Sequence, residues 1–193
     1  MKLIYDKAPL NEVTRWDILR RSQRESPERY LKKKFYRAKD FNNVSFEKLF
    51  TNDSFVWKSR VGDYIVTVSF EGAFENLKQI TKSWSGTNRW KRITLSILTK
   101  CLSQALDTED LYLDCTCPDQ VYRFNYWLTQ ADAKYGTQQN MPPKVRNVRD
   151  NKGYCCKHLL SVLYGKRWVP AAARAWLNYI KANPELTEDF IWG

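Results

Sequence analysis

This chain of 193 residues contains a single histidine, and it lacks the features that mark several common classes of protein. No run approaches the ~20 apolar residues that a membrane-spanning helix needs. Residues 1–10 are too polar, and too short of an apolar centre, for a secretory signal. There is no internal repeat and no low-complexity segment. We therefore expect a protein of a reducing compartment with no membrane partner.

Signatures of catalysis are also missing from the sequence. We find no glycine-rich phosphate loop and no nucleophile elbow. If the only histidine binds a metal, none is left for general acid–base catalysis. The acid pairs Glu109/Asp110 and Glu188/Asp189 are typical of helix ends and solvated surfaces. The sequence therefore favours a protein that is not an enzyme.

What the sequence does contain is a group of metal-binding residue types in two short segments. The pattern is Cys115-x-Cys117, a gap of 38 residues, and then Cys156-x-His158. Three thiolates and one imidazole are the donors of a closed, tetrahedral zinc site. Because four protein donors leave no position for a substrate or an activated water, we expect the zinc to be structural.

The local patterns fit this pairing of the two segments. Apolar residues and cysteines alternate through Leu111, Leu113, Cys115 and Cys117, which predicts a strand with both thiols on one face. The second pair lies where an apolar helix begins, and a spacing of two residues is poor within a helix. We therefore place Cys156 just before that helix and His158 in its first turn.

Three alternatives for the cysteines stay open at this point. Cys155 could replace Cys156 as the ligand. Cys115 and Cys117 could be ordinary buried residues, because free cysteines are often buried. For the same reason we expect Cys101 to be a core residue and not a fifth ligand. A disulfide between Cys115 and Cys117 is disfavoured, because the two are too close in an extended strand to bridge comfortably.

The metal-ligand pattern resembles that of the SWIM-type zinc fingers, although the gap of 38 residues is longer than is usual in that family. The residues around it, 114–127, 142–147 and 156–159, look like SWIM-like proteins of tailed bacteriophages, and crAss-like phage virion proteins are the best match. The resemblance covers about residues 50–165. It implies zinc as the cofactor, with Cys115, Cys117, Cys156 and His158 as the ligands.

The same resemblance implies a function. It suggests a structural protein of a tailed-phage virion, in the head-to-tail connector or neck, made in the host cytoplasm. The partners would be portal, neck or tail subunits, further copies of this chain in a ring or other multi-copy assembly, or DNA. The many aromatic residues, 8 Trp, 11 Tyr and 9 Phe, would then serve subunit interfaces.

The pattern of the whole chain predicts an α+β fold. A small antiparallel sheet is expected from residues 54–60, 64–71 and 110–117, covered by helices at 89–106 and 118–134. We expect a basic helical N-terminal extension at 1–44, a zinc-binding α+β core at 45–168 and C-terminal helices at 169–193. The extension should bind a partner more than it stabilises the core.

Positive charge is concentrated in two parts of the chain, which carries a net charge of +11. Residues 1–60 hold 15 Lys/Arg against 8 Asp/Glu, and residues 134–167 hold 8 against 1, so each part has a net charge of +7. The candidate partner- or phosphate-binding residues are Lys32, Lys33, Lys34, Arg37, Lys144, Arg146, Arg149 and Lys152. The last four lie in a predicted loop at 136–153 whose end would be fixed by the zinc.

These clusters also support an alternative function, a stand-alone nucleic-acid-binding SWIM zinc-finger protein. Lys and Arg contacts to phosphates would then give a steep dependence of binding on salt. No sequence-reading element such as a helix-turn-helix is evident, and clustered charges are often merely solvated. A monomer that binds duplex DNA would favour this alternative, whereas a stable ring would favour the virion protein.

Overall fold

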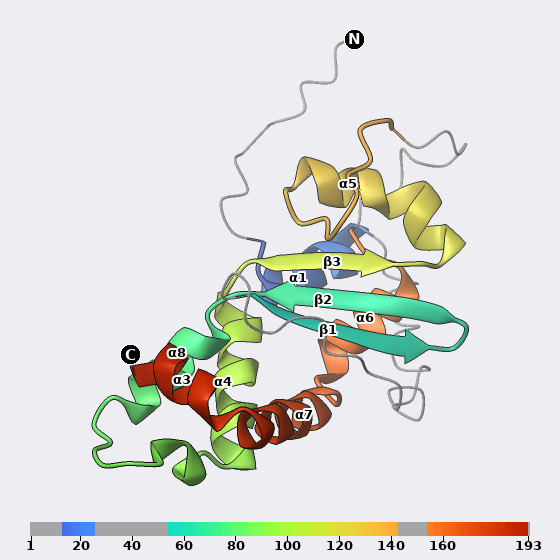
Figure 1. Ribbon diagram of the computed structural model, residues 1–193. Coiled ribbons are helices and arrows are strands. Elements are labelled where there is room, and N and C mark those ends of the chain that lie inside the picture. Colours follow the sequence, from blue (N-terminus) through green and yellow to red (C-terminus); the bar gives the residue numbers. More distant parts are fainter. Residues whose placement is uncertain (1–12, 26–53, 143–153, 193) are drawn as a thin grey trace.

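A computed structural model of the protein describes residues 13–25, 54–142 and 154–192 (Figure 1). Its centre is an antiparallel sheet in the order β1-β2-β3, formed by β1 (Phe55–Val61), β2 (Tyr64–Phe70) and β3 (Leu111–Cys115). Gly62, with a φ of 61°, lies in the two-residue turn that pairs Val61 with Tyr64. The predicted small antiparallel sheet and α+β class are confirmed.

Helices surround this sheet and make up most of the rest of the described chain. In chain order they are α1 (Arg15–Glu25), α3 (Ala73–Thr81), the 3-10 helix η3 (Arg89–Arg92), α4 (Leu95–Thr108), the π-helix η4 (Gln120–Phe124), α5 (Asn125–Gln130), α6 (Lys157–Gly165), α7 (Val169–Ala182) and α8 (Pro184–Trp192). Among the described residues, no helix has the length and apolar character needed to cross a membrane.

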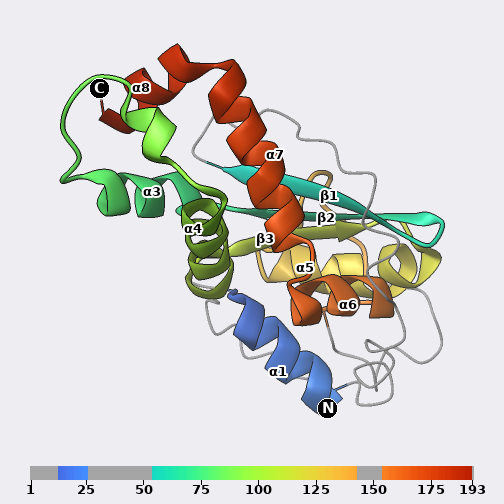
Figure 2. The ribbon, with the colours of Figure 1, turned by 90° about the horizontal axis from the view of Figure 1, so that it is seen from below.

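One face of the sheet forms the floor of the hydrophobic core. Strand register puts Trp57, Val68 and Leu113 in one row across the three strands, and all three are buried. Trp57 stacks on Trp168, with ring centroids 5.5 Å apart, and Phe55 packs against Trp176 of α7. Figure 2 shows α7 running along this face. Large aromatic side chains thus join the sheet to the C-terminal helices.

The predicted helix at 89–106 is two elements and not one, so that part of the prediction is wrong. η3 ends at Arg92, and extended backbone at Ile93 and Thr94 separates it from α4. The Thr94 hydroxyl accepts a hydrogen bond from the Ile97 N–H at 3.3 Å, so Thr94 caps the main helix. Threonine caps helices well because its side chain replaces a missing backbone acceptor.

The predicted helix at 118–134 is also shorter and less regular than expected. It opens as the π-helix η4, continues as α5 and ends at Gln130. Asp132 takes a left-handed conformation with a φ of 53°, which stops the helix. Lys134 then pairs with Leu113 as a parallel bridge, so the chain returns to the edge of β3. Figure 1 shows α5 beyond this edge.

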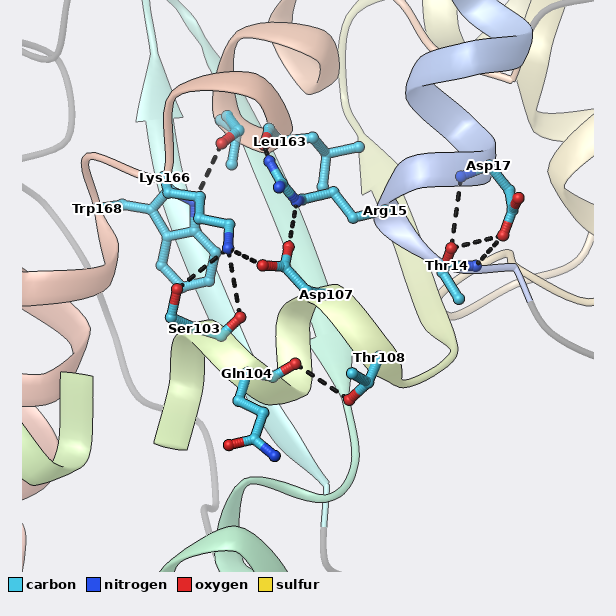
Figure 3. Close-up of polar contacts among 11 residues, drawn as sticks. Thr14, Arg15, Asp17, Ser103, Gln104, Asp107, Thr108, Leu163, Lys166 and Trp168 are labelled. Atoms are coloured by element: carbon cyan, nitrogen blue, oxygen red, sulfur yellow. Dashed lines mark hydrogen bonds and ion pairs between the residues drawn. The ribbon is translucent and has the colours of Figure 1, made fainter. Parts of the chain in front are cut away.

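The described part of the N-terminal extension belongs to the core. Ile18 and Leu19 of α1 are buried, and the Leu111 N–H donates to the Val13 carbonyl at 3.1 Å. Arg15 is 4% exposed; its Nε lies 2.6 Å from Asp107 Oδ1, and its Nη1 donates to the Leu163 carbonyl at 2.9 Å (Figure 3). Residues 13–25 therefore contribute to the core, and the expectation that the extension binds a partner more than it stabilises the core stays a prediction.

Asp107 is the centre of this contact between α1, α4 and the segment after α6. Its second carboxylate oxygen accepts from Lys166 Nζ, which also donates to the Ser103 hydroxyl at 3.0 Å (Figure 3). One carboxylate thus neutralises two cations from distant parts of the chain. Whether domain boundaries lie at 44/45 and 168/169 stays a prediction, and the first of these boundaries lies outside the described residues.

Candidate metal centre

The first pair of candidate ligands lies where β3 ends. Cys115 is the last residue of the strand and pairs with Val66. The next residue, Thr116, is tied to Ile65 in both directions, because its N–H donates to the Ile65 carbonyl and its hydroxyl accepts from the Ile65 N–H. The predicted strand extends two residues too far, since the Cys117 carbonyl already accepts the first hydrogen bonds of the next turn.

The second pair lies at the start of α6, as predicted. Cys156 has extended backbone and caps the helix, and its carbonyl accepts from the Leu160 N–H at 3.1 Å. His158 is the second residue of the helix and is 4% exposed. The side chains of a residue just before a helix and of a residue in its first turn can reach the same ion. Two residues inside a helix cannot do so when they are only two positions apart.

The four side chains meet in one buried group. The Sγ atoms of Cys115, Cys117 and Cys156 and a ring nitrogen of His158 all lie within 4.8 Å of one another. Nδ1 of His158 is 3.8 Å from Cys156 Sγ and 4.0 Å from Cys115 Sγ. A tetrahedral zinc ion with its usual bond lengths would hold such atoms about 3.5–3.8 Å apart, so small shifts complete the site. A buried Cys3His cluster that can hold a metal ion is therefore present.

The two remaining cysteines are not part of this cluster. Cys155 is buried, as is Cys101 in α4. Neither belongs to the group of four that the described residues bring together, so the geometry selects Cys156 and not Cys155. Burial raises the pKa of both thiols, that of Cys101 to about 11, which favours their neutral form. All five cysteines are free of disulfides.

Negative charge is unevenly shared among the three clustered thiols. Hydrogen bonds from Cys115 and Cys156 to the Cys117 sulfur hold the pKa of Cys117 well below its ordinary value. The same hydrogen bond raises the pKa of Cys115 to about 12, and burial raises that of Cys156. Three buried thiols thus compete to carry charge in the absence of a cation. A bound divalent ion relieves this competition because it stabilises all the thiolates together.

Gln120 organises the surroundings of the cluster, and the sequence analysis missed it. Its side chain is fully buried: Oε1 accepts from the Cys156 N–H at 2.9 Å, while Nε2 donates to the Tyr154 carbonyl and to Asn125 Oδ1, each at 3.2 Å. Its backbone N–H lies 3.3 Å from Cys117 Sγ. One residue of η4 therefore contacts both halves of the cluster. The one sequence signal that could have indicated this role is that Gln120 is a polar residue three positions after the candidate ligand Cys117.

Helix α1 reaches the cluster through a second contact that the sequence did not suggest. Arg21 donates to the Tyr154 hydroxyl and lies over that ring at 4.4 Å. Tyr154 precedes the cysteine pair and, through its carbonyl, holds Gln120. On the other side, the ring of Tyr64 packs on His158 with centroids 4.9 Å apart. Figure 2 shows α1 and α6 next to each other.

The predicted partner-binding residues lie outside the described part of the chain, so their placement stays untested. This holds for Lys32, Lys33, Lys34 and Arg37, and for Lys144, Arg146, Arg149 and Lys152. Four other cations of the second basic cluster are described, namely Lys134, Lys157, Lys166 and Arg167, and two of them, Lys134 and Lys166, are ion-paired. Lys134 Nζ lies 2.9 Å from Asp114 Oδ1, and Lys166 binds Asp107. The charge of that cluster is therefore less available to a partner than its sequence count indicates.

The fold and the cluster together define a small α+β protein with a buried Cys3His group that can hold a metal ion. Comparisons with protein-family models, with curated proteins and with solved structures found no match to this chain. The likeness to SWIM-type zinc fingers therefore rests on the residues and spacings of the sequence itself.

Proposed function

We propose that Cys115, Cys117, Cys156 and His158 hold one structural zinc ion. The observation that supports this most strongly is that four donors of the types zinc prefers converge in a wholly buried position. Such a site has no open position for a substrate or an activated water. The ion would fasten the end of β3 to the start of α6 and perform no catalysis.

Metal analysis with paired cysteine variants tests this proposal. Reduced protein purified without chelators should contain one equivalent of zinc. Cys117→Ser and His158→Ala should lose it, whereas Cys155→Ser and Cys101→Ser should keep it, although both control thiols are equally buried. Less than about half an equivalent in the native protein, or equal loss from Cys155→Ser, would overturn the assignment.

We propose further that the protein is a structural component of a tailed-phage virion, in the head-to-tail connector or neck. Support comes from the resemblance of residues 114–127 and 156–159 to SWIM-like phage proteins and from the net charge of +11. The zinc would keep a small fold rigid within an assembly of many copies. Positive charge would face DNA or acidic neighbouring subunits.

Assembly and DNA binding can be measured on the same preparation. Light scattering and electron microscopy should find a ring or another multi-copy assembly, alone or with co-expressed portal, neck and tail proteins. The alternative, a stand-alone nucleic-acid-binding protein, predicts a monomer that binds duplex DNA with an affinity that falls steeply with salt. A zinc-loaded monomer that neither assembles nor binds DNA would contradict both functions and leave the zinc assignment intact.

A further inference from the structure

A cleft lined by several polar side chains lies on the face of the sheet opposite the aromatic core. Its volume is about 710 Å³, and neighbouring strands supply its floor, because Lys58 pairs with Thr67 and Thr67 pairs with Asp114. Asn125 of α5 and Lys134 line its wall. Cys115 and Thr116 also line it, so the cleft borders the Cys3His cluster. Clefts of this size that contain a few converging polar groups are typical of small-molecule sites.

The orientation of the Asn125 amide is fixed by the hydrogen bonds around the cluster. The Cys156 N–H can only donate, so the atom of Gln120 that faces it must be the oxygen Oε1. The other end of Gln120 is therefore Nε2, a donor, and the Asn125 atom that it meets must be the oxygen Oδ1. This leaves Nδ2, with two N–H groups, as the second polar end of a side chain that lines the cleft.

Two side chains that are more than nine-tenths buried thus bring unused donors to the cleft. Asn125 is 8% exposed and Thr67 is 4% exposed. Within the described part of the chain, neither Asn125 Nδ2 nor the Thr67 hydroxyl has a hydrogen-bond partner. Neither atom is among the fully buried, unpartnered side-chain atoms of the described residues, so both are open to the cleft. A ligand that accepts hydrogen bonds would satisfy both groups.

The charges around the cleft indicate which kind of acceptor would bind. Lys134 has a side chain only 5% exposed; two of its three N–H groups have acceptors, Asp114 Oδ1 at 2.9 Å and the Tyr135 carbonyl at 2.5 Å. One donor of Lys134 is left. The Lys, Arg, Asp and Glu side chains that line the cleft are Lys58, Lys134 and Asp114, which together carry a net charge of +1. Donors in excess and a positive balance favour an oxyanion.

We propose that this cleft binds the carboxylate or phosphate group of a small molecule, with Asn125, Thr67 and Lys134 as the donors. The proposal does not depend on which metal the neighbouring cluster holds, nor on a role in a virion. It assigns a ligand site to the side of the molecule where the sequence indicated only a strand and a connecting helix.

Two isosteric substitutions test the donors without removing the contacts that hold the fold. Asn125→Asp keeps the oxygen that accepts from Gln120 and replaces the N–H donors by a second carboxylate oxygen. Thr67→Val removes only the hydroxyl. Gln130→Glu is the matched control for charge, because it adds one negative charge at an exposed position of the same helix outside the cleft.

The measurement is a titration of the full-length, metal-loaded protein, followed by nitrogen–proton NMR at constant ionic strength. Inorganic phosphate and acetate are titrated separately, so that the two sources of an oxyanion are distinguished. At least one should shift saturably both the Asn125 side-chain signals and the backbone signals of Asp114 and Lys134, which every variant retains. We expect binding to weaken at least about tenfold in Asn125→Asp and measurably in Thr67→Val, and to persist in Gln130→Glu.

Two results would overturn the proposal. One is the absence of a saturable shift at Asn125 with either anion at millimolar concentration. The other is equal weakening in Asn125→Asp and Gln130→Glu, which would show that the anion responds to overall charge and not to the cleft. Metal content is measured for every variant, and Thr67→Val, which changes no hydrogen bond of Gln120, keeps the test valid if Asn125→Asp disturbs the cluster.

Discussion

The two sides of this molecule are held together by different interactions. Where the sheet meets α7, the contacts are between large aromatic side chains, among them Trp57, Trp168 and Trp176, all fully buried. Where β3 meets α6, the buried groups are three cysteines, a histidine and a glutamine. Aromatic packing is stable without further partners, because it removes apolar surface from water. Buried thiols that compete to carry negative charge are less stable by themselves, so we expect the contact between β3 and α6 to depend on a bound cation.

Removing the metal should therefore have the largest effect, confined at first to one side. With zinc in the cluster, chelation or His158→Ala should destabilise the protein by at least about 5 kcal/mol, since structural zinc sites bind with about 10–16 kcal/mol. In hydrogen exchange, α6 should lose protection first. Helix α1 should lose protection with it, because Arg15 donates to the Leu163 carbonyl near the end of α6 and Arg21 donates to the Tyr154 hydroxyl just before α6.

The control for that experiment is the aromatic side of the same molecule. Helices α4 and α7 should keep their protection under conditions in which α6 is open. If all helices lose protection together, the fold is one cooperative unit and the contrast between the two sides is wrong.

A cavity in the aromatic core should give the reverse pattern. Trp176→Ala removes a fully buried ring that contacts Phe55 and Phe74, and it should cost about 3–5 kcal/mol in the free energy of unfolding. Metal content should stay unchanged, because the ring contacts of Trp176 are to Phe55 and Phe74, which are not part of the cluster. Denaturant unfolding and metal analysis on one sample check both statements. Metal loss in this variant would show that the two sides are coupled.

The charged contact at Asp107 lies between the two sides and should have an intermediate effect. Asp107→Asn leaves Arg15 and Lys166 without a counter-charge, and Arg15 is almost fully buried. We expect a loss of about 2–3 kcal/mol, less than for a fully buried pair because the carboxylate is 29% exposed. Asp110→Asn, which removes an exposed acid nearby, is the control and should change stability by less than about 0.5 kcal/mol.

A substitution at Gln120 tests how far the Cys3His cluster depends on the residues around it. Gln120→Met keeps the volume but removes the acceptor of the Cys156 N–H. Loss of such an outer contact weakens metal binding by about 10–100-fold in known sites, and we expect the same here. Competition with a coloured chelator gives the affinity. An unchanged affinity would mean that the four ligands are held by the backbone alone.

The smallest effect concerns the cysteine on the aromatic side. Burial raises the pKa of Cys101 to about 11, so at pH 8 only about a thousandth of it is the reactive thiolate. Mass spectrometry after alkylation should find Cys101 unmodified both with and without metal, whereas removal of the metal exposes Cys115, Cys117 and Cys156. Rapid modification of Cys101 in the metal-loaded protein would contradict this.

The sequence predicted much of this protein because several of its signals are local. Alternation through Tyr64 to Phe70 and a tight turn at Gly62 specify the hairpin, and the two-residue spacing of Cys156 and His158 places Cys156 just before α6. Local signals failed where competing caps were available. Thr94 splits one apolar run into η3 and α4, and the left-handed Asp132 ends α5 four residues early.

By itself, the sequence determined the α+β class, the three strands of the sheet and the four residue types that meet in the cluster. Only the tertiary structure decided that Cys156 and not Cys155 joins them, that Gln120 holds both halves, and that α1 is part of the core. The physical reason is distance along the chain. Arg15 meets Leu163 and Gln120 meets Cys156 only after folding, and no periodicity within a window of the sequence records contacts between partners so far apart.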